Sequence, residues 1–234
     1  MKTKASPLLC ELHAHTTWSD GAFSVAQLVD LYGRNGFDVL AVTDHAPRDE
    51  REVHAENFAA YLAAVEEEAD RAWRLYRLLV LPGLELTYDD PDPIEAAHAV
   101  AVGLRAYVDV ASGVEEMLRA ARAHGAALVA AHPYSADVAS SSARRTARFS
   151  VDRERLAPLV DRFELFNRHT LFGWVAEAGL PTVANGDFHR VEHLGGWKTL
   201  LPCVKDEAAV VDYLRSGRPS YLVRLEDRPA LRAA

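Results

Sequence analysis

The sequence has few cysteines and no long apolar run. Cys10 and Cys203 are the two cysteines among 234 residues, too few for a disulfide framework or a four-thiolate zinc site. No stretch reaches the roughly 18 consecutive apolar residues that a membrane-spanning helix needs. Residues 1–9 are too short for a secretory signal peptide, and no small-residue cleavage site follows them. We therefore expect a cytoplasmic protein without a membrane partner.

Positive charge is also in deficit. Lys and Arg number 26 against 34 Asp and Glu, which gives a formal net charge of −8. General nucleic-acid and anionic-membrane binders need clustered positive charge, so the composition argues against both classes. By contrast, 49% of the residues are hydrophobic, which is enough for a sizeable core. Histidine is abundant, with ten residues.

Short apolar runs alternate with longer segments of helical periodicity. This alternation is typical of an α/β domain with a largely parallel sheet, open or closed into a barrel. No repeat and no linker-like segment divides the chain, so residues 1–234 are expected to form a single domain. Strands are predicted at 8–13, 38–43, 78–86, 97–104, 126–131, 162–166 and 181–185, and helices at 25–35, 57–77, 114–124, 153–160, 172–178 and 207–216.

Histidines and carboxylates gather at the ends of these apolar runs. His13 and His15 lie two residues apart after the first run, and Asp20 follows them closely. Asp187 and His189 lie two residues apart after the last run. The runs between them contribute His45, Glu85, His98 and His132.

This placement predicts a metal site. Residues two apart in an extended chain project from the same face, and the C-terminal ends of parallel strands share one face of the sheet. Imidazole and carboxylate ligands suit Zn, Mn or Fe, and a carboxylate can bridge two ions. Each residue alone could be a hydrogen-bonded core or capping residue. Their recurrence at the same end of successive strands indicates a site for more than one ion.

Taken in order, these motifs resemble the PHP family, the polymerase and histidinol phosphatase superfamily of metal-dependent phosphoesterases. The resemblance implies a distorted (β/α)7 barrel with a metal cluster, usually of three ions, at the C-terminal face of the strands. It rests on His13-Ala14-His15-Thr16 with Ser19-Asp20-Gly21, on Thr43-Asp44-His45, Gly83-Leu84-Glu85 and His98, and on Ala131-His132-Pro133 and Asp187-Phe188-His189.

The resemblance also implies which residues hold which ion. Glu85 would bridge the first and second ions. Family members have either histidine or aspartate at the position of Asp20, and the harder aspartate would favour manganese or iron over zinc there. Two to three divalent ions (Zn, Mn or Fe) are therefore expected. The first would be held by His13, His15, Glu85 and Asp187, the second by Glu85, His98 and His132, and the third by Asp20, His45 and His189.

A site of this kind hydrolyses a phosphate ester with a hydroxide that bridges two ions and attacks phosphorus in line. Candidate ligands for the substrate phosphate are Arg168 and Arg190, which offer a bidentate fork, and Lys198, which offers a point charge. His169 or His193 could protonate the leaving oxygen, because the pKa of histidine lies near neutral pH. Each of these five could equally be a surface residue or an outer neighbour of the site.

The segment 140–155 is rich in serine and arginine. It could act as a mobile lid that draws in an anionic substrate. It could equally be a solvated loop that leads into the helix predicted at 153–160. The sequence favours the second interpretation slightly.

The leading hypothesis is a hydrolase that releases phosphate from a monoester of a small anionic molecule or nucleotide, with no obligatory protein partner. A 3′–5′ exonuclease or phosphodiesterase on nucleic acid is an alternative, although the net charge of −8 and the lack of an aromatic and basic stripe argue against it. Histidinol phosphatase is a further option, but nothing identifies an imidazole-recognising pocket. An incomplete ligand set would have indicated a non-catalytic, metal-stabilised binding module, whereas the set is full.

Overall fold

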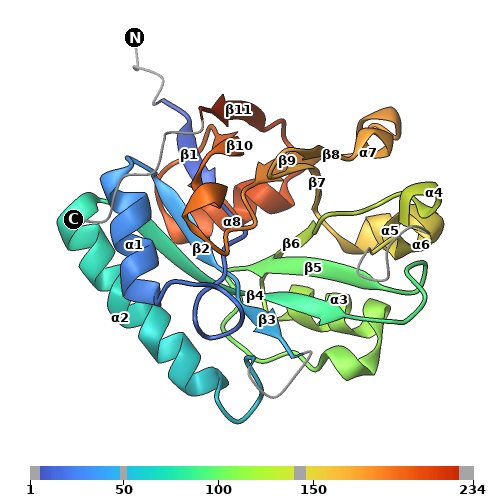
Figure 1. Ribbon diagram of the computed structural model, residues 1–234, viewed down its shortest axis with the longest axis horizontal. Helices are drawn as coiled ribbons and strands as arrows, with labels where there is room; N and C mark the ends of the chain where they lie inside the picture. Colours follow the sequence, from blue (N-terminus) through green and yellow to red (C-terminus); the bar gives the residue numbers. More distant parts are fainter. Residues whose placement is uncertain (1–5, 48–51, 140–145, 227–234) are drawn as a thin grey trace.

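The computed structural model describes residues 6–47, 52–139 and 146–226 as a mixed α/β fold around one curled sheet (Figure 1). The strand order is β11-β10-β1-β2-β4-β5-β6-β7-β8, with β3 paired to β4 and β9 paired to β7. The strands are β1 (Leu8–Glu11), β2 (Val39–Val42), β3 (His45–Ala46), β4 (Leu79–Tyr88), β5 (Ala97–Val102), β6 (Ala127–Ala130), β7 (Arg162–Asn167), β8 (Thr170–Leu171), β9 (Thr182–Asn185), β10 (Gly196–Leu201) and β11 (Tyr221–Leu225).

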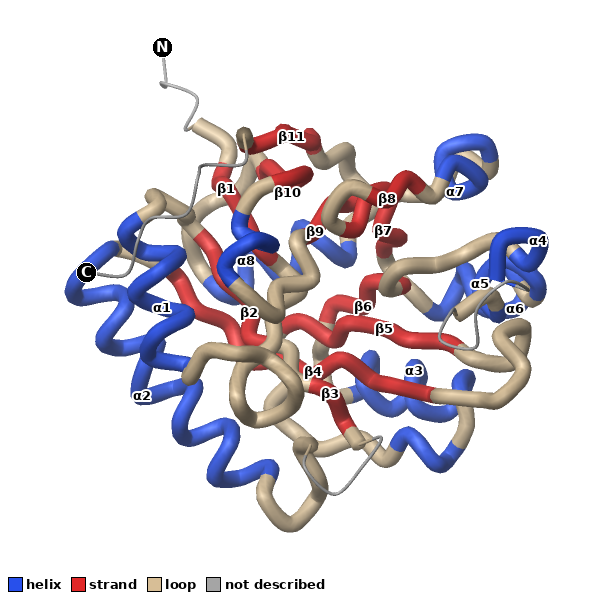
Figure 2. Tube along the Cα trace, viewed as in Figure 1, coloured by secondary structure: helices blue, strands red, loops and turns tan. Residues whose placement is uncertain are grey.

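Helices lie around this sheet, with α1 and α2 side by side along one flank and α4, α5 and α6 gathered at the opposite end (Figure 2). No helix in the described part of the chain is both long and apolar enough to cross a membrane. The α-helices are α1 (Val25–Arg34), α2 (Phe58–Tyr76), α3 (Val114–Ala123), α4 (Ala136–Ala139), α5 (Arg148–Val151), α6 (Arg153–Leu156), α7 (Gly173–Glu177) and α8 (Glu207–Arg215). Short 3₁₀ helices occupy η1 (Val110–Ser112), η2 (Ala157–Leu159) and η3 (Val191–Leu194).

Both faces of the central strands β2, β4, β5 and β6 are buried, which explains why these strands read as apolar runs rather than as alternating patterns. One face packs against the surrounding helices through residues such as Leu40 and Leu84. The other face encloses a second core, which includes Val39, Val129 and Val183. Helix α8 contributes Val210, Tyr213 and Leu214 to this second core, and therefore packs within the curl of the sheet.

The sheet is mixed, and in this the expectation of a largely parallel sheet is wrong. Strands β1, β2 and β4 are parallel, as are β6, β7 and β9. Strand β5 is antiparallel to both β4 and β6, and β10 is antiparallel to β1. Residues 89–96 join β4 to β5, and so short a connection suits an antiparallel pair rather than a crossover to a parallel strand.

The reversed direction of β5 places a ligand candidate. Because β5 runs against its neighbours, its first residues lie at the end of the sheet where β4 and β6 finish. His98, the second residue of β5, is opposite Thr87 near the end of β4. A histidine at the start of a strand thereby reaches the same end of the sheet as residues that follow other strands.

Candidate metal centre

The two pairs of ligand candidates from opposite ends of the chain are aligned by backbone hydrogen bonds. The N–H of His15 donates to the carbonyl of Phe188 at 2.8 Å, and the N–H of Phe188 donates to the carbonyl of His13 at 3.1 Å. These bonds form a parallel bridge between Ala14 and Phe188. His13 and His15, on either side of Ala14, thus lie beside Asp187 and His189, on either side of Phe188.

Four ligand atoms of this region converge. Glu85 Oε2 lies 3.4 Å from the Nε2 atoms of both His13 and His15. Asp187 Oδ1 lies 3.7 Å from His13 Nε2 and 3.5 Å from His15 Nε2. Ligands placed about 2.0–2.1 Å from a tetrahedral zinc ion are about 3.3–3.4 Å from one another. The predicted first set is therefore brought together at spacings that suit a common cation.

Three of these atoms are buried without a hydrogen bond. His13 Nε2, His15 Nε2 and Glu85 Oε2 have no hydrogen-bond partner among residues 6–47, 52–139 and 146–226. Leaving one buried polar atom unsatisfied costs about 1–3 kcal/mol. Two imidazole nitrogens and a carboxylate oxygen that point toward one another are the donor set that a divalent cation of the zinc, manganese or iron type takes. The residues present fit such an ion.

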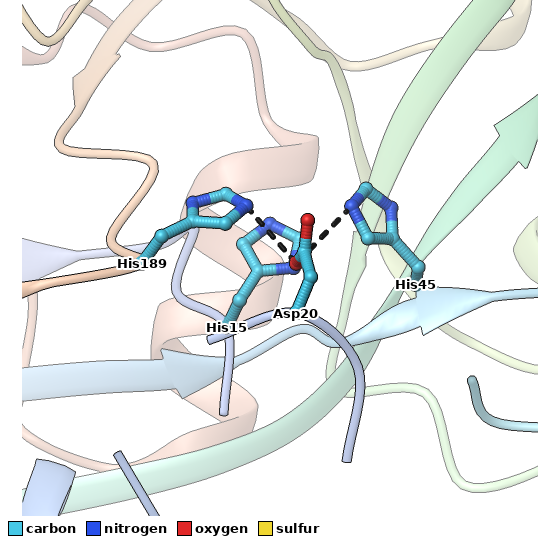
Figure 3. Close-up of side chains that lie close together, drawn as sticks. All are labelled: His15, Asp20, His45 and His189. Carbon is cyan, nitrogen blue, oxygen red and sulfur yellow. Dashed lines mark ion pairs between the residues drawn. The ribbon is translucent and has the colours of Figure 1, made fainter. Parts of the chain in front are cut away.

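A second group surrounds Asp20, whose side chain is 45% exposed. Its Oδ1 lies 3.1 Å from His189 Nε2, 3.6 Å from His45 Nε2 and 3.7 Å from His15 Nδ1 (Figure 3). The predicted third set, Asp20 with His45 and His189, is thus brought together, and His15 joins it. His15 was expected to serve only the first ion.

The third group lies on the other oxygen of Glu85. Glu85 Oε1 is 3.0 Å from His132 Nε2 and 3.2 Å from His98 Nδ1. The ligand atoms of His13, Glu85 and His132 lie close enough together to share an ion. His98 directs its other nitrogen, Nε2, to Asp89 Oδ1 at 2.9 Å. Its contact with Glu85 is therefore made through Nδ1.

Electrostatics show how strongly the cluster favours positive charge. Burial works to raise the pKa of the Glu85 carboxyl, yet His45 and His13 hold that pKa well below its usual range. Burial works to lower the pKa of His45, but Glu85 and Asp20 raise it to about 10. The pKa of His15 is lowered well below its usual value by burial and by the neighbouring His45 and His189. The carboxylates thus favour a proton on His45. A divalent cation bound to the cluster would take the place of that proton, because a ligating histidine must be neutral.

A buried carboxylate that was not among the predicted site residues lies behind His13. Glu164 Oε1 lies 2.9 Å from His13 Nδ1, and its Oε2 accepts from the backbone N–H of His132 at 2.6 Å. Asn167 and Asn185 donate to the same carboxylate. A carboxylate on the outer nitrogen of a ligating histidine fixes its tautomer and orientation. A charged residue inside the predicted apolar strand 162–166 was the signal that could have identified it.

We expect Glu164→Gln to weaken zinc binding by about 10–100-fold, the usual cost of losing such an outer partner. The reason is that the neutral amide of glutamine has one acceptor oxygen and no charge. It therefore cannot pair with the His13 imidazole and also accept hydrogen bonds from the N–H of His132 and from both asparagines. Zinc dissociation constants from competition with a chromophoric chelator measure the effect. Glu67→Gln on the exposed face of α2 is the matched control. Equal zinc affinity in the two variants would contradict the role of Glu164.

Asp44, the middle residue of the Thr43-Asp44-His45 motif, organises the loop that carries Asp20. It is buried and accepts from the N–H and the hydroxyl of Thr16 and from the hydroxyl of Ser19. Burial raises the pKa of Asp44, and these three donors act in the opposite direction. The loop between His15 and Asp20 is thereby folded back onto Asp44, which brings Asp20 over His15.

The candidate phosphate ligands are placed differently from one another. Arg168 donates through Nε and Nη2 to the carbonyl of Asp187, and its Nη2 lies 3.1 Å from Asp187 Oδ2. Arg190 is exposed, near His193 and Glu192. Lys198 is completely buried, with its Nζ 2.7 Å from Glu11 Oε2. A buried ammonium paired with a carboxylate is not open to a substrate, so the expectation for Lys198 is corrected.

The two candidate proton donors also differ. His193 Nδ1 accepts from the backbone N–H of His189 at 3.1 Å. Burial, together with Arg168 and His189, lowers the pKa of His193 to about 4, which works against a role as a proton donor near neutral pH. His169 is exposed in the turn between β7 and β8.

The arginine-rich segment 140–155 is partly described. Residues 140–145, which include Arg144 and Arg145, lie outside the described residues. Arg148 pairs with Glu95 and Asp152, and Arg155 pairs with Glu115. The helix predicted at 153–160 is observed as α6 followed directly by η2.

The fold and this cluster agree with comparisons to known proteins. The chain matches the PHP domain family over residues 11–169. The DNA polymerase/3′-5′ exonuclease PolX of Bacillus subtilis (strain 168) is 24% identical over 216 residues, which cover 81% of this chain and 35% of that protein. The chain thus spans about a third of the length of this curated relative.

Solved structures share the fold at low sequence identity. A two-domain protein of Bacteroides vulgatus ATCC 8482, described as containing a PHP-like metal-dependent phosphoesterase, has a TM-score of 0.66 at 17% identity, over 96% of this chain and 70% of that one. An amidohydrolase of Chromobacterium violaceum with bound sulfate has a TM-score of 0.51 at 15% identity, over 77% of this chain and 87% of that one. The family match covers more than half of the sequence. The chain therefore belongs to the PHP domain family.

Proposed function

We propose that the chain is a metal-dependent phosphoesterase that releases phosphate from a monoester of a small anionic molecule or nucleotide. The observation that carries the proposal is the convergence of His13 Nε2, His15 Nε2 and Glu85 Oε2, which are buried and without hydrogen bonds within the described residues. We further propose that three ions bind, one to each ligand group, in a barrel of the distorted (β/α)7 type. Bound divalent cations would supply an activated water and would neutralise charge on the phosphoryl oxygens.

The chain's own residues would orient the substrate. Arg190 follows His189 directly in the sequence and presents an exposed guanidinium. Arg168 is more than one-third exposed and is fixed by its bonds to Asp187, so it offers a pre-oriented positive charge. The exposed guanidinium of Arg190 is suited to bidentate contact with a phosphate. His169, exposed beside Arg168, is the remaining candidate for protonating the leaving oxygen.

The test is phosphate release after the purified chain is loaded with Zn²⁺, Mn²⁺ or Fe²⁺. The substrates are a panel of phosphomonoesters that includes sugar phosphates and nucleoside monophosphates. We expect at least one metal to support turnover, and we expect His13→Ala to lose bound metal and activity together. A fully metal-loaded protein that cleaves no phosphomonoester or phosphodiester would instead indicate a binding module.

A second candidate function is exonuclease or phosphodiesterase activity on nucleic acid. It is favoured by the similarity to PolX, whose description includes a 3′-5′ exonuclease. The net charge of −8 opposes it, because strand-tracking proteins use a positively charged groove. A single-stranded oligonucleotide labelled at its 5′ end distinguishes the two functions, since exonuclease action yields a ladder of shortened products. Release of phosphate from monoesters with no shortening of the oligonucleotide is the expected result.

A further inference from the structure

A buried ion pair lies beside the ligand groups without belonging to them. Glu11 is the last residue of β1, and Lys198 lies in β10, which pairs with β1. Both side chains are 0% exposed, and Lys198 Nζ is 2.7 Å from Glu11 Oε2. The two charges are therefore completely removed from water, which is expensive for each of them.

The contacts of this pair reach the backbone that carries the ligands. The N–H of Gly186 donates to both oxygens of Glu11, at 2.9 and 3.0 Å. The N–H of His13 also donates to Glu11, at 3.3 Å. Lys198 donates to the carbonyl of His193 at 3.2 Å. The pair thus connects β1 to the segment that runs from Gly186 through Asp187 and His189 to His193.

The segment that it holds has an uncommon backbone conformation. Asp187 has a φ of +45°, in the left-handed region that non-glycine residues seldom adopt. Bonds on both sides keep it there, from Gly186 N–H to Glu11 and from Arg168 to the Asp187 carbonyl. A Cβ at position 186 would overlap Lys198 Nζ and Glu11 Oε2, so the pair lies directly against this backbone.

A second ligand residue combines a left-handed backbone with a hydrogen bond to a buried carboxylate. His132 has a φ of +29°, and its N–H donates to the buried Glu164 at 2.6 Å. In both cases a buried carboxylate binds a backbone N–H at or next to a left-handed ligand residue. Strained backbone of this kind costs free energy and persists only where its surroundings hold it.

Stability alone does not account for the pair. Replacing a buried ion pair with apolar residues of similar volume is often neutral or stabilising. We propose that Glu11 and Lys198 are positioning residues, which hold the Gly186–Asp187 backbone so that the Asp187 carboxylate faces His13 and His15. The inference rests on the proposed metal site and does not depend on the substrate.

The experiment compares zinc affinity in three variants and the wild type. Glu11→Leu with Lys198→Met removes both charges and the acceptor for Gly186. Glu11→Gln with Lys198→Met is also neutral but keeps one oxygen that can accept from Gly186. Tyr32→Phe is the matched control, because it removes the 3.2 Å hydroxyl contact to Glu11 and leaves the ion pair intact. Circular dichroism and thermal unfolding establish that each variant is folded.

We expect the Leu/Met variant to lose about 10–100-fold in zinc affinity, the usual cost of an outer partner. The Gln/Met variant should lose less, and Tyr32→Phe should bind zinc as the wild type does. Cobalt substitution adds a second readout, because the visible spectrum of Co²⁺ changes when a carboxylate ligand is displaced. If the Leu/Met variant does not fold, the zinc affinity and the cobalt spectrum of the Gln/Met variant test the positioning role.

Two results would overturn different statements. Folded double variants with wild-type zinc affinity and an unchanged cobalt spectrum would overturn the positioning role. A wild-type chain that binds neither Zn²⁺ nor Co²⁺ would overturn the proposed function instead.

Discussion

Asp187→Ala is expected to abolish phosphoesterase turnover and to lower zinc affinity by more than about 100-fold, which is beyond the usual cost of losing an outer partner. Asp187 Oδ1 lies 3.7, 3.5 and 3.3 Å from nitrogens of His13, His15 and His189, so one carboxylate serves two ligand groups. Elemental analysis of the purified protein and phosphate release from a monoester measure the two losses.

Asp70→Ala on the exposed face of α2 is the control for this substitution, because it removes an exposed carboxylate that belongs to no ligand motif. Asp187→Asn separates charge from shape, since it keeps an oxygen and a similar volume. We expect it to retain the fold and to lose most of the affinity. Unchanged metal content in Asp187→Ala would show that Asp187 is not a ligand.

Arg162→Met is expected to lower the free energy of unfolding by about 2–4 kcal/mol. The Arg162 side chain is buried and donates to the carbonyls of Tyr213, Leu214 and Arg218, at the end of α8 and just beyond it. Hydrogen bonds from a charged donor contribute about 1.5–3 kcal/mol each, and relief from burying the guanidinium offsets part of the loss. Urea unfolding followed by circular dichroism measures the change.

Arg215→Met is the matched control, since Arg215 is exposed on the same helix. An exposed substitution of this type should stay within about 0.5 kcal/mol of the wild type. Zinc affinity should be unchanged in Arg162→Met, because none of its hydrogen bonds reaches a ligand segment. Equal unfolding free energies for the two variants would mean that Arg162 does not hold α8.

The strands of the core could be predicted because both faces of the sheet are buried. The seven predicted strands correspond to β1, β2, β4, β5, β6, β7 and β9. Strands β10 and β11 were missed, since the first begins at Gly196 and carries Lys198 and the second is partly exposed and carries Arg224. Strand direction was harder to predict, because the periodicity of a buried strand is the same in either orientation.

The ligand set could be predicted because pairs such as His13 and His15 are two residues apart, a spacing that places both side chains on one face of an extended chain. The residues that hold the ligands could not, because their partners are distant in sequence. Glu11 lies next to a motif but bonds to Gly186, and Glu164 serves His13 from another strand. Lys198 was assigned to the substrate because an isolated lysine shows no sign of the carboxylate that it meets in the fold.

Asp187 and His13 come from opposite ends of the chain, and β1 lies between β2 and β10 in the sheet. A cation bound by both would act as a cross-link that closes residues 13–187, about three-quarters of the polypeptide, into a loop. Closing a long loop removes more entropy from the unfolded chain than closing a short one. Metal loading should therefore protect β1 from separating from the sheet, and hydrogen exchange at its amides would slow when zinc is added.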